Sequence, residues 1–143
     1  MTSPSSVATI EIFGTEIPII EYQGQRVITF AIIDKVHQRP EGTAKDRFRK
    51  NRKRFVEGKD FYLIDSSQKN AFHSFGISIP PRGLIILTKS GYLMLVKSLT
   101  DDLAWKVQRA LVNHYFRNKP TADIRSRKVQ QPLFHSLLLI KSG

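Results

Sequence analysis

The residues with the clearest chemistry lie in Thr43–Phe55, where seven cationic side chains accompany one acid, Asp46, within thirteen residues. The cations are Lys45, Arg47, Arg49, Lys50, Arg52, Lys53 and Arg54. Lysine and arginine neutralise phosphates, and arginine can also form two hydrogen bonds to guanine in the major groove of DNA. Because a solvated surface helix normally mixes charges of both signs, this stretch predicts an anionic partner.

Drawn as a helix with about 100° between residues, the same stretch divides into an apolar arc and a cationic remainder. The apolar arc consists of Ala44, Phe48 and Phe55. Arg49, Lys50 and Lys53 lie farthest from this arc, so we expect them to make the most direct contacts with nucleic acid. Thr43 stands at the predicted N-terminus of the helix, where it and the free N–H groups beside it offer a phosphate site.

The composition limits the class of protein and of partner. The chain has 143 residues, 41% of them hydrophobic, and its 23 Lys and Arg against 12 Asp and Glu give a net charge of +11. These values predict one folded domain whose partner is nucleic acid or an acidic membrane surface. No apolar run approaches the roughly 20 residues of a membrane span, and residues 1–9 lack a signal-peptide pattern, so we expect no membrane partner. The absence of cysteine excludes disulfides and thiolate metal sites and suits the reducing cytoplasm.

The acidic and histidine side chains form no pattern that predicts catalysis or metal binding. Asp34 and His37 are three residues apart on one predicted helix, and we expect a neighbouring acid to satisfy the histidine. Asp101 and Asp102 suggest a magnesium site, but capping of the following helix explains them. Because the sequence also lacks a glycine-rich phosphate loop and a nucleophile motif, we predict a non-catalytic protein without metal or cofactor.

Hydrophobic alternation predicts a small antiparallel sheet at the start of the chain, followed by a helix. The predicted strands are Ala8–Phe13, Ile17–Tyr22 and Arg26–Phe30. Thr29 is the predicted N-cap of a helix over Phe30–Gln38, and a break that contains proline and glycine follows it. Thr43 then caps the basic helix, with Asp46 in place of the glutamate of a capping box. Helix, short break and second helix have the outline of a helix-turn-helix.

The second half of the chain predicts two more strands and two more helices. The predicted strands are Phe61–Ile64 and Leu84–Leu87, and Thr88 caps a helix with apolar residues at helical spacing, namely Tyr92, Leu95, Val96 and Leu99. The next helix, Asp102–Phe116, is apolar almost all round, so we expect it to be central to the core or partly buried in a partner subunit. We accordingly expect Trp105, Tyr115 and Phe116 to lie in the core instead of stacking on bases.

Together these elements predict an α+β fold, in which a small, mainly antiparallel sheet packs with about four main helices, including a helix-turn-helix-like unit. Residues 8–118 form the predicted DNA-binding domain, and residues 119–143 form a basic linker and a short apolar C-terminal tail. Two basic segments leave alternatives open. The turn Gln23–Arg26 is either a wing that carries Arg26 to DNA or a structural turn, and Arg125–Lys128 either follows phosphates or is a solvated tail.

Three runs of sequence carry a family resemblance: GQRVITFAIIDKVHQRPEGTAKDRFRKNRKRF from residue 24, DFYLI from residue 60 and LIILTKSGYLMLVKSLTDDLAWKVQRALVNHYF from residue 84. Together they resemble the phage open-reading-frame-six N-terminal (ORF-six-N) domain family, which is grouped with the KilA-N and BRO-N domains of viral and prophage regulators. The resemblance covers roughly Ile17–Asn118. It implies a DNA-binding module without catalytic residues, often found at the front of phage antirepressors and therefore located in the cytoplasm of a bacterial host. Lys89 departs from the pattern, which has an acid before the Ser-Gly-Tyr run.

We therefore predict a non-catalytic module that binds double-stranded DNA in a phage or prophage transcriptional regulator of the antirepressor type. The predicted DNA-contacting residues are Arg39, Thr43, Lys45, Arg47, Arg49, Lys50, Arg52, Lys53 and Arg54. Two alternatives stay open: a protein-interaction module that binds a repressor through the apolar segment Leu133–Ile140, and RNA binding. A pseudo-palindromic operator would imply a homodimer.

Overall fold

Four short strands begin the part of the chain that the computed structural model describes, which comprises residues 7–117 and 127–129. They are β1 (Thr9–Ile12), β2 (Thr15–Pro18), β3 (Ile20–Tyr22) and β4 (Gln25–Thr29). β1 and β2 form an antiparallel hairpin, whereas β3 and β4 pair antiparallel in a second sheet. The single strand predicted over Ile17–Tyr22 is therefore wrong. The ladder with β1 continues one residue past Pro18, because the Ile19 N–H donates to the Ala8 carbonyl at 2.9 Å, and the chain then enters the second sheet at Ile20.

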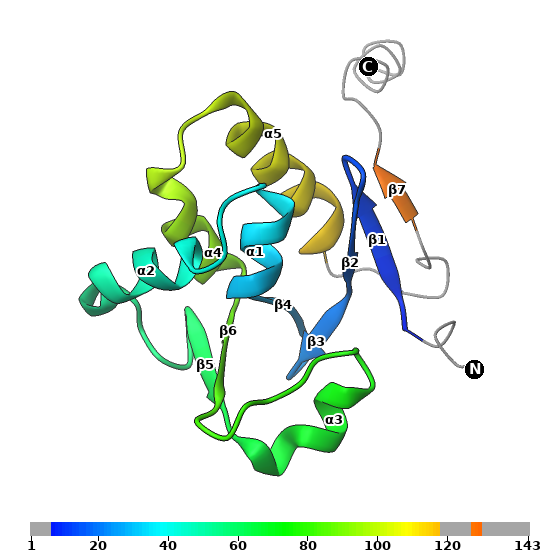
Figure 1. The fold of residues 1–143 in the computed structure, drawn as a ribbon, viewed down its shortest axis with the longest axis vertical. Helices are drawn as coiled ribbons and strands as arrows, with labels where there is room; N and C mark the ends of the chain where they lie inside the picture. Colours follow the sequence, from blue (N-terminus) through cyan, green and yellow to red (C-terminus); the bar gives the residue numbers. More distant parts are fainter. Residues whose placement is uncertain (1–6, 118–126, 130–143) are drawn as a thin grey trace.

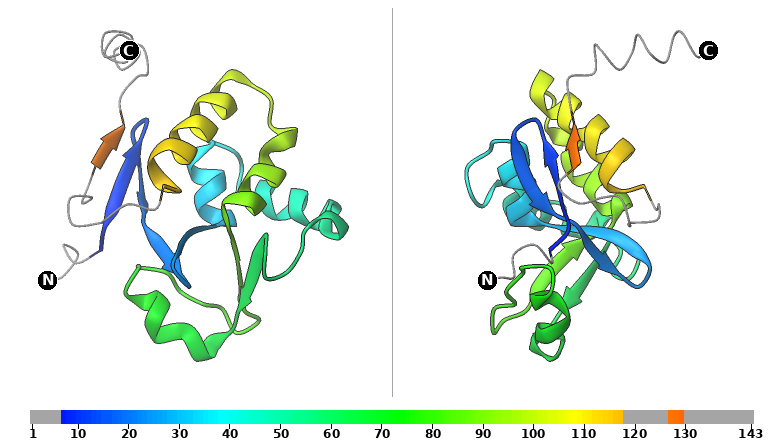
Figure 2. Two further views of the ribbon diagram at one scale, coloured as in Figure 1. Left: turned by 180° about the vertical axis from the view of Figure 1, so that it is seen from behind. Right: turned by 90° about the vertical axis from the view of Figure 1, so that its right-hand side faces the viewer.

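Later segments complete both sheets (Figures 1 and 2). The first sheet has the order β2-β1-β7, in which β7 (Arg127–Val129) runs parallel to β1. The second has the order β3-β4-β6-β5 with antiparallel neighbours, and its later strands are those predicted, β5 (Phe61–Ile64) and β6 (Leu84–Leu87). The α+β class is confirmed, although two small sheets replace the single predicted one. β7 falls within the predicted linker, and the rest of residues 119–143 lies outside the described residues.

The described chain also contains α1 (Phe30–Val36), α2 (Thr43–Lys50), α3 (Lys69–His73), α4 (Lys89–Leu95) and α5 (Asp102–Ala110). Single turns of 3₁₀-helix occupy Arg52–Arg54, Ser66–Gln68 and Val96–Ser98, and a π-helical turn, Leu111–Tyr115, extends α5. Three predicted helix starts are confirmed, because the side chains of Thr29, Thr88 and Asp101 each accept a hydrogen bond from a first-turn N–H group. No helix within the described residues has the length and apolar character to cross a membrane.

The helices place α2 at an edge of the molecule. α1 contacts β2, β4 and β6, and α4 contacts β4 and β6, so both lie against the central strands of the second sheet. α2 contacts α1 and α4 and extends outward on the side away from β1 and β7 (Figure 1). The pair formed by α1 and α2 has the predicted order of helix, break and helix.

Most of the predicted core residues are buried, with one clear exception. All four apolar residues predicted for the helix after Thr88 are buried, as are Tyr115 and Phe116. Trp105 is 62% exposed, so its predicted place in the core is wrong. The buried face of α5 is formed by Ala104, Val107 and Ala110, and Trp105 projects about 100° away from Ala104 on the helix.

Arg26 belongs to the core and not to a DNA-binding wing. It is 2% exposed, its Nε donates to the Glu21 carboxylate at 3.1 Å, and its Nη1 donates to the Tyr115 carbonyl at 3.0 Å. The Tyr115 hydroxyl in turn donates to the Val27 carbonyl and accepts from the Ile20 N–H. These contacts join the end of α5 to β3 and β4, so the structural-turn interpretation of Gln23–Arg26 holds.

Candidate nucleic-acid interface

The predicted basic helix is divided into two pieces at Asn51. α2 ends at Lys50, Asn51 adopts φ −116° and ψ 24°, and a 3₁₀ turn over Arg52–Arg54 follows. The Asn51 side-chain amide donates to the Arg47 carbonyl at 3.0 Å. Such local bonds from a short polar side chain to the backbone compete with helix continuation. The single helix predicted over Thr43–Phe55 is therefore wrong in its second half.

The predicted apolar anchors of this segment are confirmed. Ala44, Phe48 and Phe55 are 1%, 2% and 4% exposed, respectively. The Phe48 ring lies in an aromatic cluster, with ring centroids 4.8 Å from Phe55 and 5.1 Å from Phe61. Aromatic pairs at this separation add about 0.5–1.5 kcal/mol to the stabilisation from burial alone. The cluster fixes both α2 and the 3₁₀ turn on the domain, and it leaves Arg49, Lys50 and Lys53 exposed between the anchors.

The carboxylate of Asp34 in α1 caps the N-terminus of α2. It accepts from the Gly42 N–H and from the Ala44 N–H, both at 2.8 Å, and is 5% exposed. Gly42 is the N-cap residue, with φ 98°, a left-handed conformation that glycine adopts without strain. The predicted N-cap at Thr43 is therefore wrong: its hydroxyl donates to the Pro40 carbonyl at 2.7 Å. The N–H groups that we expected to be free for a phosphate are occupied.

The other two expectations for this turn are also corrected. Asp46 forms no capping box but pairs with Lys50 at 3.2 Å. No acid satisfies His37, whose Nε2 instead forms a 2.8 Å hydrogen bond with the Tyr92 hydroxyl. Burial, and secondarily the nearby Arg39, lower the pKa of His37 to about 4. At neutral pH His37 is therefore an uncharged core residue beneath the turn between α1 and α2.

The structure places the nine predicted contact residues in three different environments. Lys45, Arg49, Lys50, Lys53 and Arg54 are exposed on α2 and the following turn, and we call these five residues the basic surface. Thr43 and Arg47 are half-buried. Arg39 is half-buried and forms an ion pair with Asp101, so the start of α5 already engages its charge.

Arg52 is exposed but already has aromatic and backbone partners. Its guanidinium lies 4.6 Å from the centroid of the Phe61 ring and 5.7 Å from that of Phe48, a cation–π arrangement. It also donates to the Phe55 carbonyl at 3.2 Å. The side chain therefore covers the aromatic cluster, and its predicted role in DNA contact competes with this structural role.

A network around Asp60 fixes the chain that follows the basic surface. The Asp60 carboxylate accepts from the Val56 N–H at 2.9 Å and from the Ser90 hydroxyl at 2.6 Å. The Asp60 carbonyl accepts from the Thr88 N–H at 3.0 Å, at the start of α4. Gly91 packs against the same carbonyl, which would lie 2.0 Å from a Cβ atom at this position. Only glycine can therefore occupy this contact between α4 and the Asp60 backbone.

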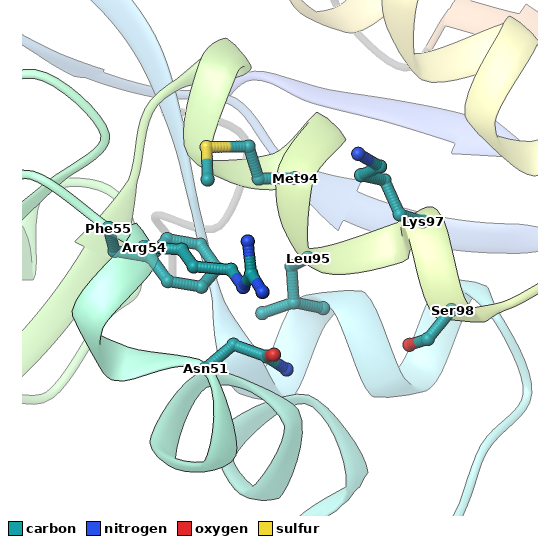
Figure 3. Close-up of a pocket in the computed structure, with 7 residues that line it drawn as sticks. All are labelled: Asn51, Arg54, Phe55, Met94, Leu95, Lys97 and Ser98. Carbon is teal, nitrogen blue, oxygen red and sulfur yellow. The ribbon is translucent and has the colours of Figure 1, made fainter.

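A pocket of about 520 Å³ borders the basic surface, and sequence patterns did not indicate it. Its lining residues are Asn51, Arg54, Phe55, Met94, Leu95, Lys97 and Ser98 (Figure 3). They come from the end of the basic segment and from α4 with its 3₁₀ turn, two segments about forty residues apart in the sequence. The contact between α2 and α4 helps to bring them together. No group of three or more potential metal ligands occurs among the described residues.

Comparison with known proteins identifies one family. The sequence model of the ORF6N domain matches residues 17–98 of this chain. This range includes both the basic surface and the pocket. Searches of curated proteins and of solved structures found no match.

Proposed function

The chain belongs to the ORF6N domain family, and on this premise we propose that it is a non-catalytic module that binds double-stranded DNA. The proposed setting is a phage or prophage regulator of transcription of the antirepressor type, acting in the bacterial cytoplasm. The observation that carries the proposal is the basic surface, where five cations are exposed on α2 and the following 3₁₀ turn, and Asp46 is the one acid in Thr43–Phe55. A phosphate backbone would relieve the repulsion among these cations.

The size and attachment of α2 also suit this partner. An α-helix with its side chains is about 10–12 Å across, close to the width of about 12 Å of the DNA major groove, and α2 has about two turns of such helix. Phe48 and Phe55 hold the helix from its inner side, so its outer side is available without loss of core contacts. Arg49 on α2 and Lys53 on the 3₁₀ turn that follows it are both exposed, and Arg49 has the chemistry to recognise guanine.

A salt titration tests the proposal. If five phosphates are neutralised, log K should fall against log salt concentration with a slope of about −4 to −5. Replacing Arg49, Lys50 and Lys53 with alanine should make this slope shallower by about 2 to 3 units. The matched control replaces Lys69, Arg82 and Lys106, which are exposed cations outside the basic surface. Equal slopes for the two triple variants would refute DNA contact through the basic surface. Competition with duplex RNA tests the RNA alternative.

A second function, self-association, is favoured by the exposed Trp105 on α5. Asp102 and Arg109 are exposed on the same helix, one turn before and one turn after Trp105. Two antiparallel copies of α5 related by a two-fold axis would place Asp102 of each copy opposite Arg109 of the other. Exposed aromatic residues with arginine neighbours are typical centres of protein interfaces.

Sedimentation of charge-reversal variants tests this second function. Arg109→Asp should weaken self-association because it places two acids opposite each other, and adding Asp102→Arg should restore it. Trp105→Ala should also weaken self-association, and the charge reversal at Asp102 and Arg109 should not restore it. A wild-type protein that stays monomeric at concentrations of 100 µM, on the order of the affinity of weak complexes, would exclude self-association. A pull-down of a repressor with and without Leu133–Gly143 tests the remaining alternative of a protein partner.

A further inference from the structure

The pocket beside the basic surface has two cations and an apolar floor. Arg54 lies on one side and Lys97 on the other, and both side chains are exposed. Phe55 and Leu95 are buried beneath them, at 4% and 3% exposure, and Met94 is half-buried. Figure 3 shows the guanidinium of Arg54 extending into the pocket above this floor.

The polar groups of this pocket suit an anion. None of its lining residues is acidic, and Asn51 and Ser98 add an amide and a hydroxyl to the two cations. Within the described residues, Arg54 and Lys97 form no ion pair, in contrast to Lys50 and Arg39. Two unpaired cations beside a pocket favour a ligand with more than one negative charge or with charges in series.

The apolar floor limits the ligand further. The floor of Phe55, Leu95 and Met94 can stabilise a ligand only by burying apolar surface. A free inorganic anion has no apolar surface, so it gains little from this floor. A strand of DNA backbone combines charged phosphates with the apolar faces of its sugars. Such a strand can place phosphates at Arg54 and Lys97 and a sugar against the floor between them.

The position of the pocket indicates which duplex would supply this strand. Arg54 belongs both to the basic surface and to the pocket, and Asn51 lies between Lys50 and that arginine. A duplex in contact with Arg49 and Lys53 would therefore lie next to the pocket. We propose that the pocket binds the sugar–phosphate backbone of the same duplex, with Lys97 neutralising one phosphate beside the major-groove contact. This inference rests on the proposed DNA-binding function and adds α4 to the interface.

The first test is the salt dependence of Lys97→Ala in the full chain. Loss of one phosphate contact should make the slope shallower by about 0.9 and weaken binding about fivefold at 0.15 M salt. Lys97→Arg should keep the wild-type slope, because it keeps the charge. Lys69→Ala, an exposed lysine on α3, should also leave the slope unchanged. Thermal unfolding of each variant separates loss of contact from loss of fold.

The second test locates the phosphate on the DNA. Single phosphates of a selected duplex are replaced in turn by uncharged methylphosphonate. At one phosphate position, the replacement should weaken binding of the wild type about fivefold but leave binding of Lys97→Ala unchanged. This result would show that Lys97 contacts that phosphate. If Lys97→Ala matches the wild type while the triple variant of α2 has a shallower slope, the pocket proposal is overturned and the proposed function stands. If neither variant changes the slope, both fail.

Discussion

The carboxylate of Asp34 provides the sharpest test of how α2 is held. Asparagine at this position keeps the shape of the side chain but removes its charge and one of its two acceptor oxygens. One of the two N–H groups, at Gly42 or Ala44, would then face the amide NH₂ group instead of an acceptor. The other would keep a neutral hydrogen bond. The Asp34→Asn substitution therefore perturbs the start of α2 and changes no side chain of the basic surface.

The expected loss of stability follows from these two bonds. A hydrogen bond to a charged group contributes about 1.5–3 kcal/mol, and a buried donor without a partner costs about 1–3 kcal/mol. Losing one bond and weakening the other should lower the free energy of unfolding by about 3 kcal/mol. With an m-value of about 1.5 kcal/mol/M, the midpoint of urea unfolding should fall by about 2 M. The cap is 5% exposed, so added salt should screen little of this effect.

The control is the same substitution on the exposed side of the same helix. Asp46→Asn removes an exposed ion pair with Lys50, which contributes about 0.3–0.5 kcal/mol. Urea unfolding followed by circular dichroism compares the two variants at equal net charge. Hydrogen exchange should show faster exchange at Gly42 and Ala44 in Asp34→Asn only. A difference in unfolding free energy below about 0.5 kcal/mol between the variants would refute the capping role.

Two further predictions concern the core beneath the interface. Because the pKa of His37 is lowered to about 4, the unfolded chain, with a pKa near 6.5, binds the proton more readily. The stability that the neutral His37 contributes should be fully present above about pH 6.5, and the free energy of unfolding should fall by about 3 kcal/mol as the pH approaches 4. In urea titrations His37→Gln should reduce this loss of stability at low pH. Gly91→Ala would place a methyl group 2.0 Å from the Asp60 carbonyl oxygen. It should therefore destabilise the fold by about 3 kcal/mol or more in thermal unfolding, whereas Ser90→Ala should cost about 1 kcal/mol.

Local patterns in the sequence were sufficient for much of the fold. Thr29, Thr88 and Asp101 cap the helices that follow them because capping depends on residues three positions apart. Strands β5 and β6 have the predicted bounds, since short apolar runs between turns leave few alternatives. The anchors Phe48 and Phe55 were also predictable, because each is an isolated aromatic residue among charged ones.

The wrong predictions have a different cause. In each case the structure depends on a contact with a residue that is distant in the sequence, or on which face of a helix packs against the core. Asp34 caps α2 after the chain has reversed direction. Its spacing from His37 suggested that the two residues interact, whereas His37 bonds Tyr92 instead. Trp105 was assigned to the core because apolar residues were counted around a helix whose buried face was unknown. Lys97 meets Arg54 at the pocket through tertiary packing, which includes the contact of α4 with α2, and no sequence spacing indicates it.

The charges around α2 also indicate where along the helix the proposed DNA recognition should occur. Asp34 and Asp46 place negative charge at the N-terminal end of α2, whereas Arg49, Lys50 and the 3₁₀ turn place cations at its C-terminal end. In many helix-turn-helix proteins the N-terminal residues of the second helix contact the bases. Here phosphates and bases should instead be contacted from the C-terminal end, beside the pocket.

Selection of bound sequences from a random duplex library tests this polarity. Arg49→Ala should change the preferred sequence, because loss of a bidentate contact to guanine removes about 1–3 kcal/mol of discrimination. Lys45→Ala, on the first turn of α2, should weaken binding uniformly and leave the preferred sequence unchanged. The opposite result would place recognition at the N-terminal end of α2.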